Sequence, residues 1–218
     1  CEREVMKNAL AEGAGDRFDG VQWKRLPPLN RYDSIIAYCD PSFKGTTKND
    51  YKANKVWGRI GNELHHIDSF VRQCSVSEML RWFYDLHERM PEGVICNYYI
   101  EANFLQDIIL DEFVREGSMR GYQLPIRPDK RKKPDKFARI EAISPLWERG
   151  FVYYNIDKKN DRDMLTGLDQ LLALEKGSTV NDDGPDADEG AIWLLQRQTR
   201  MENFTPRIGR RTTSKNIW

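Results

Sequence analysis

The stretch "SIIAYCDPSFKGTTKNDYKA" (residues 34–53) joins an apolar run to a polar, glycine-containing segment. Its first part, residues 34–40, is short, apolar and rich in strand-favouring residues, which predicts a buried β-strand. That strand ends in a carboxylate, Asp40, and a second one, Asp50, precedes the next apolar run. Open α/β sheets place functional sites where strands end. A single Asp at a strand end also suits a turn or a cap, so this stretch alone leaves both interpretations open.

The segments that follow predict one mixed sheet. "YKANKVWGRIG" and "ELHHIDSFVRQ" flank the pair Gly61-Asn62, a pattern typical of a β-hairpin. Further strands are predicted at "VICNYYIE" (94–101), "YQLPIRP" (122–128) and "FVYYN" (151–155). Predicted helices separate these strands, which indicates an α/β fold with helices on both faces of the sheet.

The predicted helices have recognisable ends. Ser75 or Ser77 can cap a helix that runs through "SEMLRWFYDLHERM", and Gly117 is expected to close the next one, "FLQDIILDEFVREG". Pro145 is expected to kink or split "PDKFARIEAISPLWERG", which has Asp135 near its start. The last two helices are "DRDMLTGLDQLLAL" and the segment that begins at the acidic cluster around Asp183.

The composition excludes some classes of protein but does not identify a binding partner. The chain has 218 residues with 34 basic and 34 acidic side chains, enough for one large or two small domains. The four cysteines lack metal-type spacing, and no apolar run approaches the roughly 18 residues of a membrane span. We therefore expect a reducing, intracellular compartment and no membrane partner. Because the chain begins with Cys and not with Met, we expect it to be a piece of a longer protein.

Three sections of chain are expected to differ in role. Residues 1–30 are expected to be a linker, residues 31–200 to form the α/β domain, and residues 201–218 to be a basic, flexible tail. Charge is also segregated. Residues 127–139 hold seven basic and two acidic side chains, whereas residues 155–190 hold ten acidic and four basic ones. This distribution predicts a basic surface close to an acidic centre.

Carboxylates recur at three points that an α/β fold can bring together. Asp40 ends the first predicted strand, Glu101 ends the fourth, and a cluster at 182–186 opens the last helix. Tips of neighbouring strands lie about 4.8 Å apart, so two such carboxylates can share an ion. Converging carboxylates repel one another unless a cation neutralises them, and hard oxygen ligands suit Mg²⁺ or Mn²⁺. The pattern predicts a metal site, while an acidic helix start that merely complements the helix dipole remains an alternative.

The helical periodicity of the last segment ranks the three aspartates of that cluster. At about 100° per residue, Asp183 lies closest to the apolar stripe, so it is expected to be the inward ligand. Asp186 is the second candidate, and Asp182 is expected to act as a cap or an outer-shell group.

Three segments that contain the acidic residues resemble those of a known family. The segments "YCDPSFKGTTKNDYKA", "YYIEANFLQDII" and "NDDGPDADEGA", taken in order, resemble the nuclease domain of the large terminase subunit of tailed phages. "DKFARIEAISPLWERGFVYYN" is similar to the segment between that family's second and third acidic motifs. The resemblance covers about residues 32–200 and implies an RNase H-like fold.

The resemblance also implies a function. It implies metal-dependent endonuclease cleavage of double-stranded viral DNA at the start and end of packaging, inside the bacterial host cytoplasm. Asp40, Glu101 and Asp183 would be the catalytic acids, with Asp182, Asp186 and Asp50 as further ligands, and two Mg²⁺ or Mn²⁺ ions are expected. The implied partners are the ATPase domain of the parent chain, the portal protein and the small terminase subunit. This chain has no phosphate-loop motif, so the ATPase would lie elsewhere in the parent protein.

Basic residues near the acidic motifs are candidates for DNA contact. Lys136 and Arg139 share one helix face at i and i+3, and they are expected to hold the DNA backbone. The run Lys130, Arg131, Lys132 and Lys133 predicts an exposed basic loop, although a solvated charge run is the alternative. Lys44 lies in a basic, glycine-containing turn where a phosphate could approach.

Two other function classes remain open from the sequence. One is another RNase H-like nuclease, such as a junction resolvase or a transposase-type enzyme. The other is a DNA-binding, motor-coupling module whose carboxylates are structural.

Overall fold

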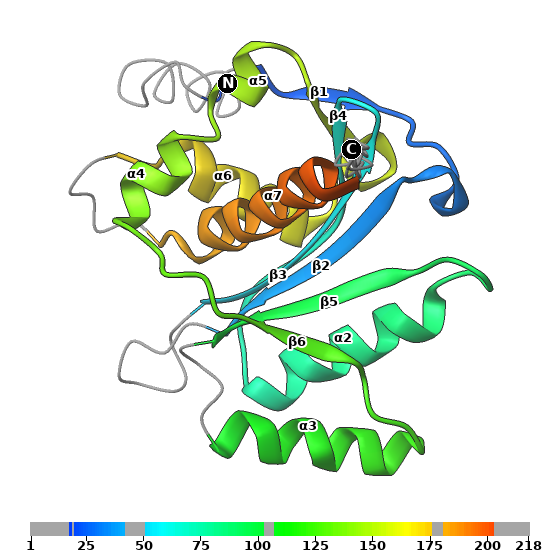
Figure 1. The fold of residues 1–218 in the computed structure, drawn as a ribbon. Coiled ribbons are helices and arrows are strands. Elements are labelled where there is room, and N and C mark those ends of the chain that lie inside the picture. The colour runs from blue at the N-terminus through cyan, green and yellow to red at the C-terminus, as the bar shows by residue number, and fades with distance from the viewer. Residues whose placement is uncertain (1–17, 19, 42–50, 103–106, 176–180, 203–218) are drawn as a thin grey trace, which may run out of the picture.

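The computed structural model describes residues 18, 20–41, 51–102, 107–175 and 181–202, and it is built on one seven-stranded sheet (Figure 1). The strand order is β1-β7-β4-β3-β2-β5-β6. The strands are β1 (Gln22–Lys24), β2 (Ser34–Asp40), β3 (Tyr51–Ile60), β4 (Glu63–Gln73), β5 (Cys96–Glu101), β6 (Ile126–Asp129) and β7 (Val152–Asn155). The three central strands β2, β3 and β4 are antiparallel, and the outer pairings are parallel.

Helices cover both faces of this sheet, which confirms the predicted α/β architecture (Figure 1). The helices are α2 (Val76–Arg89), α3 (Asp107–Arg120), α4 (Lys136–Glu141), α5 (Pro145–Glu148), α6 (Arg162–Leu172) and α7 (Asp183–Glu202). Helices α2 and α3 pack on one face, while α4, α6 and α7 lie over the other. None of the helices within the described ranges is long and apolar enough to cross a membrane.

The alternation of side chains along β2 supplies both cores. Ile36 and Tyr38 point toward α7, whereas Ile35, Ala37 and Cys39 point toward α2, because successive side chains of a strand face opposite sides. All five are almost fully buried. Residues 35–39 form an unbroken apolar run because both faces of the strand are covered, as predicted for a buried strand.

The predicted turns and caps are largely confirmed. Gly61 has a positive φ of 55° in the β3–β4 turn, a backbone conformation that glycine adopts without strain. The Ser75 hydroxyl accepts a hydrogen bond from the Glu78 amide and caps α2, and Asp135 caps α4 in the same way. Pro145 splits its segment in two, since α4 ends before it and α5 begins with it.

Two sequence expectations need correction. Residues 1–30 were expected to be a linker, yet Gln22–Lys24 forms β1, which pairs with β7 at the sheet edge. Helix α3 does not close at Gly117 but continues to Arg120. Its end is set by Gly121, which has a φ of 81°, and by the hydrogen bond from the Tyr122 amide to the Gly117 carbonyl. This six-to-one bond is the usual signature of a glycine-terminated helix.

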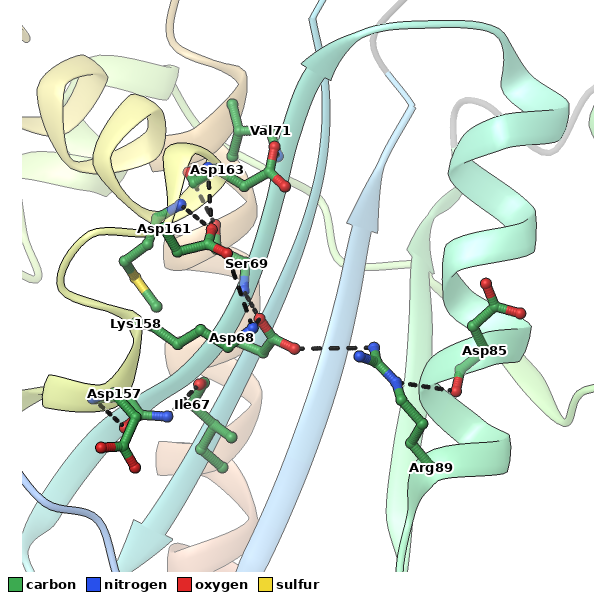
Figure 2. A network of polar contacts seen from close by, with 12 residues as sticks. Ile67, Asp68, Ser69, Val71, Asp85, Arg89, Asp157, Lys158, Asp161 and Asp163 are labelled. Carbon is green, nitrogen blue, oxygen red and sulfur yellow. Dashed lines mark hydrogen bonds and ion pairs between the residues drawn. The ribbon is translucent and has the colours of Figure 1, made fainter.

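A β-bulge in β4 brings polar contacts to neighbouring elements of the fold (Figure 2). The register of β3 with β4 shifts once and leaves Ile67 as an extra residue, whose carbonyl accepts a hydrogen bond from the Asn155 side chain. The next residue, Asp68, pairs with Lys158 at 3.0 Å and with Arg89 at 3.9 Å. The bulge thereby connects β4 with α2 on one side and with the chain after β7 on the other.

Candidate metal centre

Two adjacent parallel strands, β2 and β5, each end in a buried carboxylate. Asp40 is 2% exposed and Glu101 is 7% exposed, and the parallel register of β2 with β5 brings the two strand ends side by side. Helix α7 adds a third carboxylate, Asp186, which is 3% exposed. One ligand oxygen from each of these three residues lies within 4.8 Å of the other two. This three-carboxylate group is the candidate metal centre.

Helix α7 packs close against β2 because a glycine, Gly190, faces that strand. A Cβ atom at Gly190 would lie 2.5 Å from Cζ of Tyr38, so only glycine permits this close approach. Asp188 fixes the helix from below. It accepts a 2.8 Å hydrogen bond from the Trp57 indole and pairs with the fully buried Lys55 ammonium at 3.3 Å.

The structure distinguishes the three aspartates at the start of α7. Asp186 joins Asp40 and Glu101 in the three-carboxylate group. Asp183 is also buried, at 2% exposure, and its charge contributes to raising the pKa of Asp40. Asp182 is more exposed and pairs with Lys136 at 3.1 Å. The periodicity ranked Asp183 first because it assumed one inward stripe, whereas every residue of 183–192 is buried.

The pKa values of Asp40 and Asp186 are shifted in opposite directions. Burial raises the pKa of Asp40 well above its usual range, and the negative charges of Asp186, Glu101 and Asp183 add to that effect. Burial would also raise the pKa of Asp186, but nearby cations, with Lys136 the largest contributor, outweigh it and lower that pKa. In the ion-free centre, burial and the neighbouring negative charges therefore oppose ionisation of Asp40, whereas the neighbouring cations favour ionisation of Asp186.

A cationic collar, which we define as Lys133, Lys136 and Arg139, surrounds these carboxylates. Lys133 Nζ lies 3.0 Å from Glu101 Oε1. Lys136 Nζ lies 3.2 Å from Asp186, and Arg139 pairs with Asp186 at 2.8 Å. The sequence predicts DNA contacts for these three cations; in the structure each contacts an acidic side chain, and their contact with DNA stays a prediction.

The predicted basic loop at 130–133 is only partly exposed. Lys130 and Lys132 are exposed, but Arg131 forms a bidentate pair with Glu189 at 2.6 and 2.8 Å. Glu189 also contacts Arg139. Arg131 thus holds the middle of α7 to the loop, because burying Glu189 on the underside of that helix requires a cationic partner. The expected ligand Asp50 and the expected DNA contact Lys44 lie outside the described residues.

A groove of about 520 Å³ opens beside the centre, between the end of β6 and the second half of α7. Its lining is basic and aromatic. The guanidinium groups of Arg131 and Arg197 lie 4.3 and 5.1 Å from the centroid of the Trp193 ring. Ten residues line the groove: Tyr99, Pro128, Asp129, Lys130, Arg131, Lys132, Trp193, Leu194, Arg197 and Gln198.

Sequence reasoning missed Asp129 and Glu189. Asp129 ends β6 in register with Glu101, so the rule that singled out the other strand-end acids would have found it had the strand been extended by one residue. It accepts a 2.9 Å hydrogen bond from the Tyr38 hydroxyl and pairs with Arg131 at 3.6 Å. Asp129 therefore already has two partners, and it lies next to the three-carboxylate group without being a member of it.

Comparisons with known proteins identify the fold. No protein-family model matches the chain, and no curated protein matches it. Among solved structures, the human cytomegalovirus terminase nuclease domain aligns with a TM-score of 0.52 at 16% identity, covering 85% of this chain and 95% of that one. The nuclease domain of the g2p large terminase from bacteriophage SPP1, with bound Mn, aligns with a TM-score of 0.53 at 14% identity, covering 82% and 98%.

A longer solved structure matches this chain over part of its own length. The large terminase from a thermophilic bacteriophage aligns with a TM-score of 0.54 at 14% identity, and the match covers 83% of this chain. The match spans 45% of that terminase, less than half of its length. The mixed sheet, the helices on both faces and these alignments show that this chain has the RNase H-like fold of terminase nuclease domains.

Proposed function

We propose that this chain is the metal-dependent nuclease domain of a terminase large subunit, which cleaves double-stranded viral DNA when genome packaging begins and ends. The observation that carries this proposal is the three-carboxylate group at the ends of β2 and β5, beneath α7. Buried carboxylates so close together repel one another and destabilise a fold unless cations neutralise them, and such clusters concentrate at functional sites. A divalent cation that serves phosphodiester hydrolysis would neutralise them here.

The donor set fits a hard divalent cation. Asp40, Glu101 and Asp186 offer only oxygen ligands, and their spacing of at most 4.8 Å allows one ion to contact all three. Such oxygen sets suit Mg²⁺ and Mn²⁺. When bound, the ion lowers the pKa of an attacking water and stabilises charge on the phosphate. Asp183, buried beside Asp40, is the candidate for an additional ligand.

The protein's own side chains prepare this centre. Lys136 and Arg139 keep Asp186 ionised, since their charges lower its pKa. A bound cation would offset the burial and the neighbouring negative charges that raise the pKa of Asp40. The groove beside the centre provides exposed cations at Lys130, Lys132 and Arg197, which suit the phosphates of a DNA backbone.

The proposal extends to the parent protein. A chain that matches less than half of a longer large terminase would work beside the ATPase domain of the same subunit. The portal protein and the small terminase subunit would then be its assembly partners, in the cytoplasm of a bacterial host.

The decisive experiment is nicking of a supercoiled plasmid with Mn²⁺ or Mg²⁺. We expect cleavage by the natural sequence, loss of cleavage by at least about 100-fold in Asp40→Asn and in Asp186→Asn, and full cleavage by Asp111→Asn. Asp111 is a matched control because it is exposed on α3, on the opposite face of the sheet.

Three outcomes would overturn the proposal or part of it. Cleavage that persists in both site variants would remove the assigned centre. DNA binding without cleavage by the natural sequence would favour a non-catalytic module. Cleavage restricted to branched DNA would instead indicate a resolvase.

A further inference from the structure

The groove beside the three-carboxylate group is lined by two aromatic side chains as well as by cations. Trp193 on α7 and Tyr99 on β5 both line it, and both are half-buried. Neither the Trp193 indole N–H nor the Tyr99 hydroxyl forms a hydrogen bond with a described residue, whereas the buried Trp57 indole donates to a carboxylate. Packed Tyr and Trp side chains usually find a partner for their polar tips. These two tips are therefore available to a molecule that occupies the groove.

Two arginines lie over the Trp193 ring, and they are held differently. Arg131 has its guanidinium 4.3 Å from the ring centroid and is fixed there by its bidentate pair with Glu189. Arg197 lies 5.1 Å from the centroid, is exposed, and forms no ion pair with any described residue. Arg131 therefore holds the indole in place, whereas the Arg197 guanidinium is available to pair with a phosphate.

The aromatic lining lies close to the carboxylates along both elements that carry it. Tyr99 precedes Glu101 by two residues on β5, so the two side chains point to the same face of the sheet. Trp193 follows Asp186 by seven residues of α7, which places both on one side of the helix, about 10 Å apart along its axis. A DNA strand with one phosphate at the carboxylates would therefore have neighbouring nucleotides within reach of Trp193.

This combination of side chains suits an unpaired strand better than an intact duplex. The bases of a duplex are stacked on one another and present only their edges in the grooves of the DNA, so they cannot stack on a half-buried ring. An unpaired strand exposes its base faces, and proteins bind it with cations along the backbone and aromatic rings under the bases. The groove offers exposed cations at Lys130, Lys132 and Arg197 around its two aromatic side chains.

We propose that this groove binds an unpaired segment of DNA, with one base stacked at Trp193 and the phosphates held by Lys130, Lys132 and Arg197. The inference rests on the proposed function, because DNA is the substrate of the neighbouring centre. Trp193 would be a positioning residue that keeps one unpaired strand next to the carboxylates.

Fluorescence anisotropy with a labelled deoxythymidine oligonucleotide tests the stacking, in a chelator so that binding is measured without cleavage. Trp193→Leu keeps an apolar, helix-favouring side chain but removes the ring, and it is expected to weaken binding about 10-fold. Trp193→Phe keeps a flat ring and should retain most of the affinity. Trp82→Leu is the matched control, because Trp82 is also half-buried under an arginine, Arg89, but lies on α2 on the other face of the sheet. It should bind like the natural sequence.

Two further probes separate contacts with bases from contacts with phosphates. An oligonucleotide of the same length whose sugars carry no bases should bind the natural sequence about 10-fold more weakly than the deoxythymidine oligonucleotide. Trp193→Leu should not weaken its binding further. A blunt duplex should bind the natural sequence and Trp193→Leu equally, because its bases do not reach the ring.

Equal binding of the two single-stranded oligonucleotides by the natural sequence would overturn the inference without reliance on any variant. A loss of duplex affinity in Trp193→Leu as large as its loss of single-strand affinity would also overturn it, as would an equal loss in Trp82→Leu. Plasmid nicking that persists alongside any of these results would leave the nuclease proposal standing. Base-dependent binding without nicking by the natural sequence would instead overturn the nuclease proposal and support the groove as a site for unpaired DNA.

Discussion

The two faces of the central sheet are packed by different kinds of side chain. The face toward α2 is mainly apolar, with residues such as Phe83 and Met79 fully buried, although β3 also buries Lys52 and Asn54 on that side. The face toward α7 also has an apolar core, but it buries many more ionisable groups, among them Asp40, Lys55 and Asp188. Burying charge costs free energy that apolar packing elsewhere must offset. The contrast suggests that the α2 face stabilises the fold, and that the α7 face gives up stability to hold a charged site.

The largest expected effect comes from the apolar face. Phe83→Ala should lower the free energy of unfolding by about 3–5 kcal/mol, because it opens a cavity at a fully buried position. Chemical denaturation measures this loss. Below the melting temperature of the variant, Mn²⁺ affinity should be unchanged, since Phe83 packs on the face away from the carboxylates. A variant that loses ion binding while still folded would contradict the division between the faces.

The buried pair under α7 tests the charged face. Lys55→Met should destabilise the protein by about 3–5 kcal/mol, because it leaves Asp188 buried without its ammonium partner. The double variant Lys55→Met with Asp188→Asn should recover most of that loss, since the amide oxygen can still accept the hydrogen bond from Trp57. A double variant as unstable as Lys55→Met alone would show that the charge itself is required for folding.

A smaller effect is expected from Asp40 in the presence of a chelator. The folded-state pKa of this carboxyl is raised, so its favourable contribution is complete below its unfolded-state pKa and is lost as pH rises through the folded-state pKa. Asp40→Asn cannot ionise and should therefore be more stable than the natural sequence at high pH, with the difference vanishing in acid. Thermal melts across a pH series measure it, and a difference that grows toward acid would contradict the assignment.

The smallest expected effect concerns the groove. Lys130→Gln and Lys132→Gln should each weaken DNA binding modestly and reduce the slope of log affinity against log salt by about 1. Both side chains are exposed, so unfolding free energies should stay within about 0.5 kcal/mol of the natural value. Fluorescence anisotropy at several salt concentrations measures the slope. An unchanged slope in both variants would place the DNA elsewhere.

Sequence patterns predicted the elements better than the orientation of the side chains. Asp40 and Glu101 were identifiable because each ends a short apolar run, and the hairpin at Gly61 follows from its turn residues. Strand β1 was missed because three residues at the sheet edge leave no periodic signal. The choice between Asp183 and Asp186 could not be made from periodicity, since α7 is buried all round at that point.

The inward turn of the collar was also beyond sequence reasoning. A basic run such as 130–133 has the same composition whether it faces solvent or a buried acid. Only the packing of α7, with Glu189 against Arg131 and Arg139, turns alternate members of the run inward.

The most direct test of the central claim is an anomalous difference map from a crystal of this chain soaked in Mn²⁺. The account predicts a peak among Asp40, Glu101 and Asp186, about 2.1 Å from its ligand oxygens. A map with no peak within contact distance of Asp40, or with Mn²⁺ bound only at other acidic groups, would contradict it.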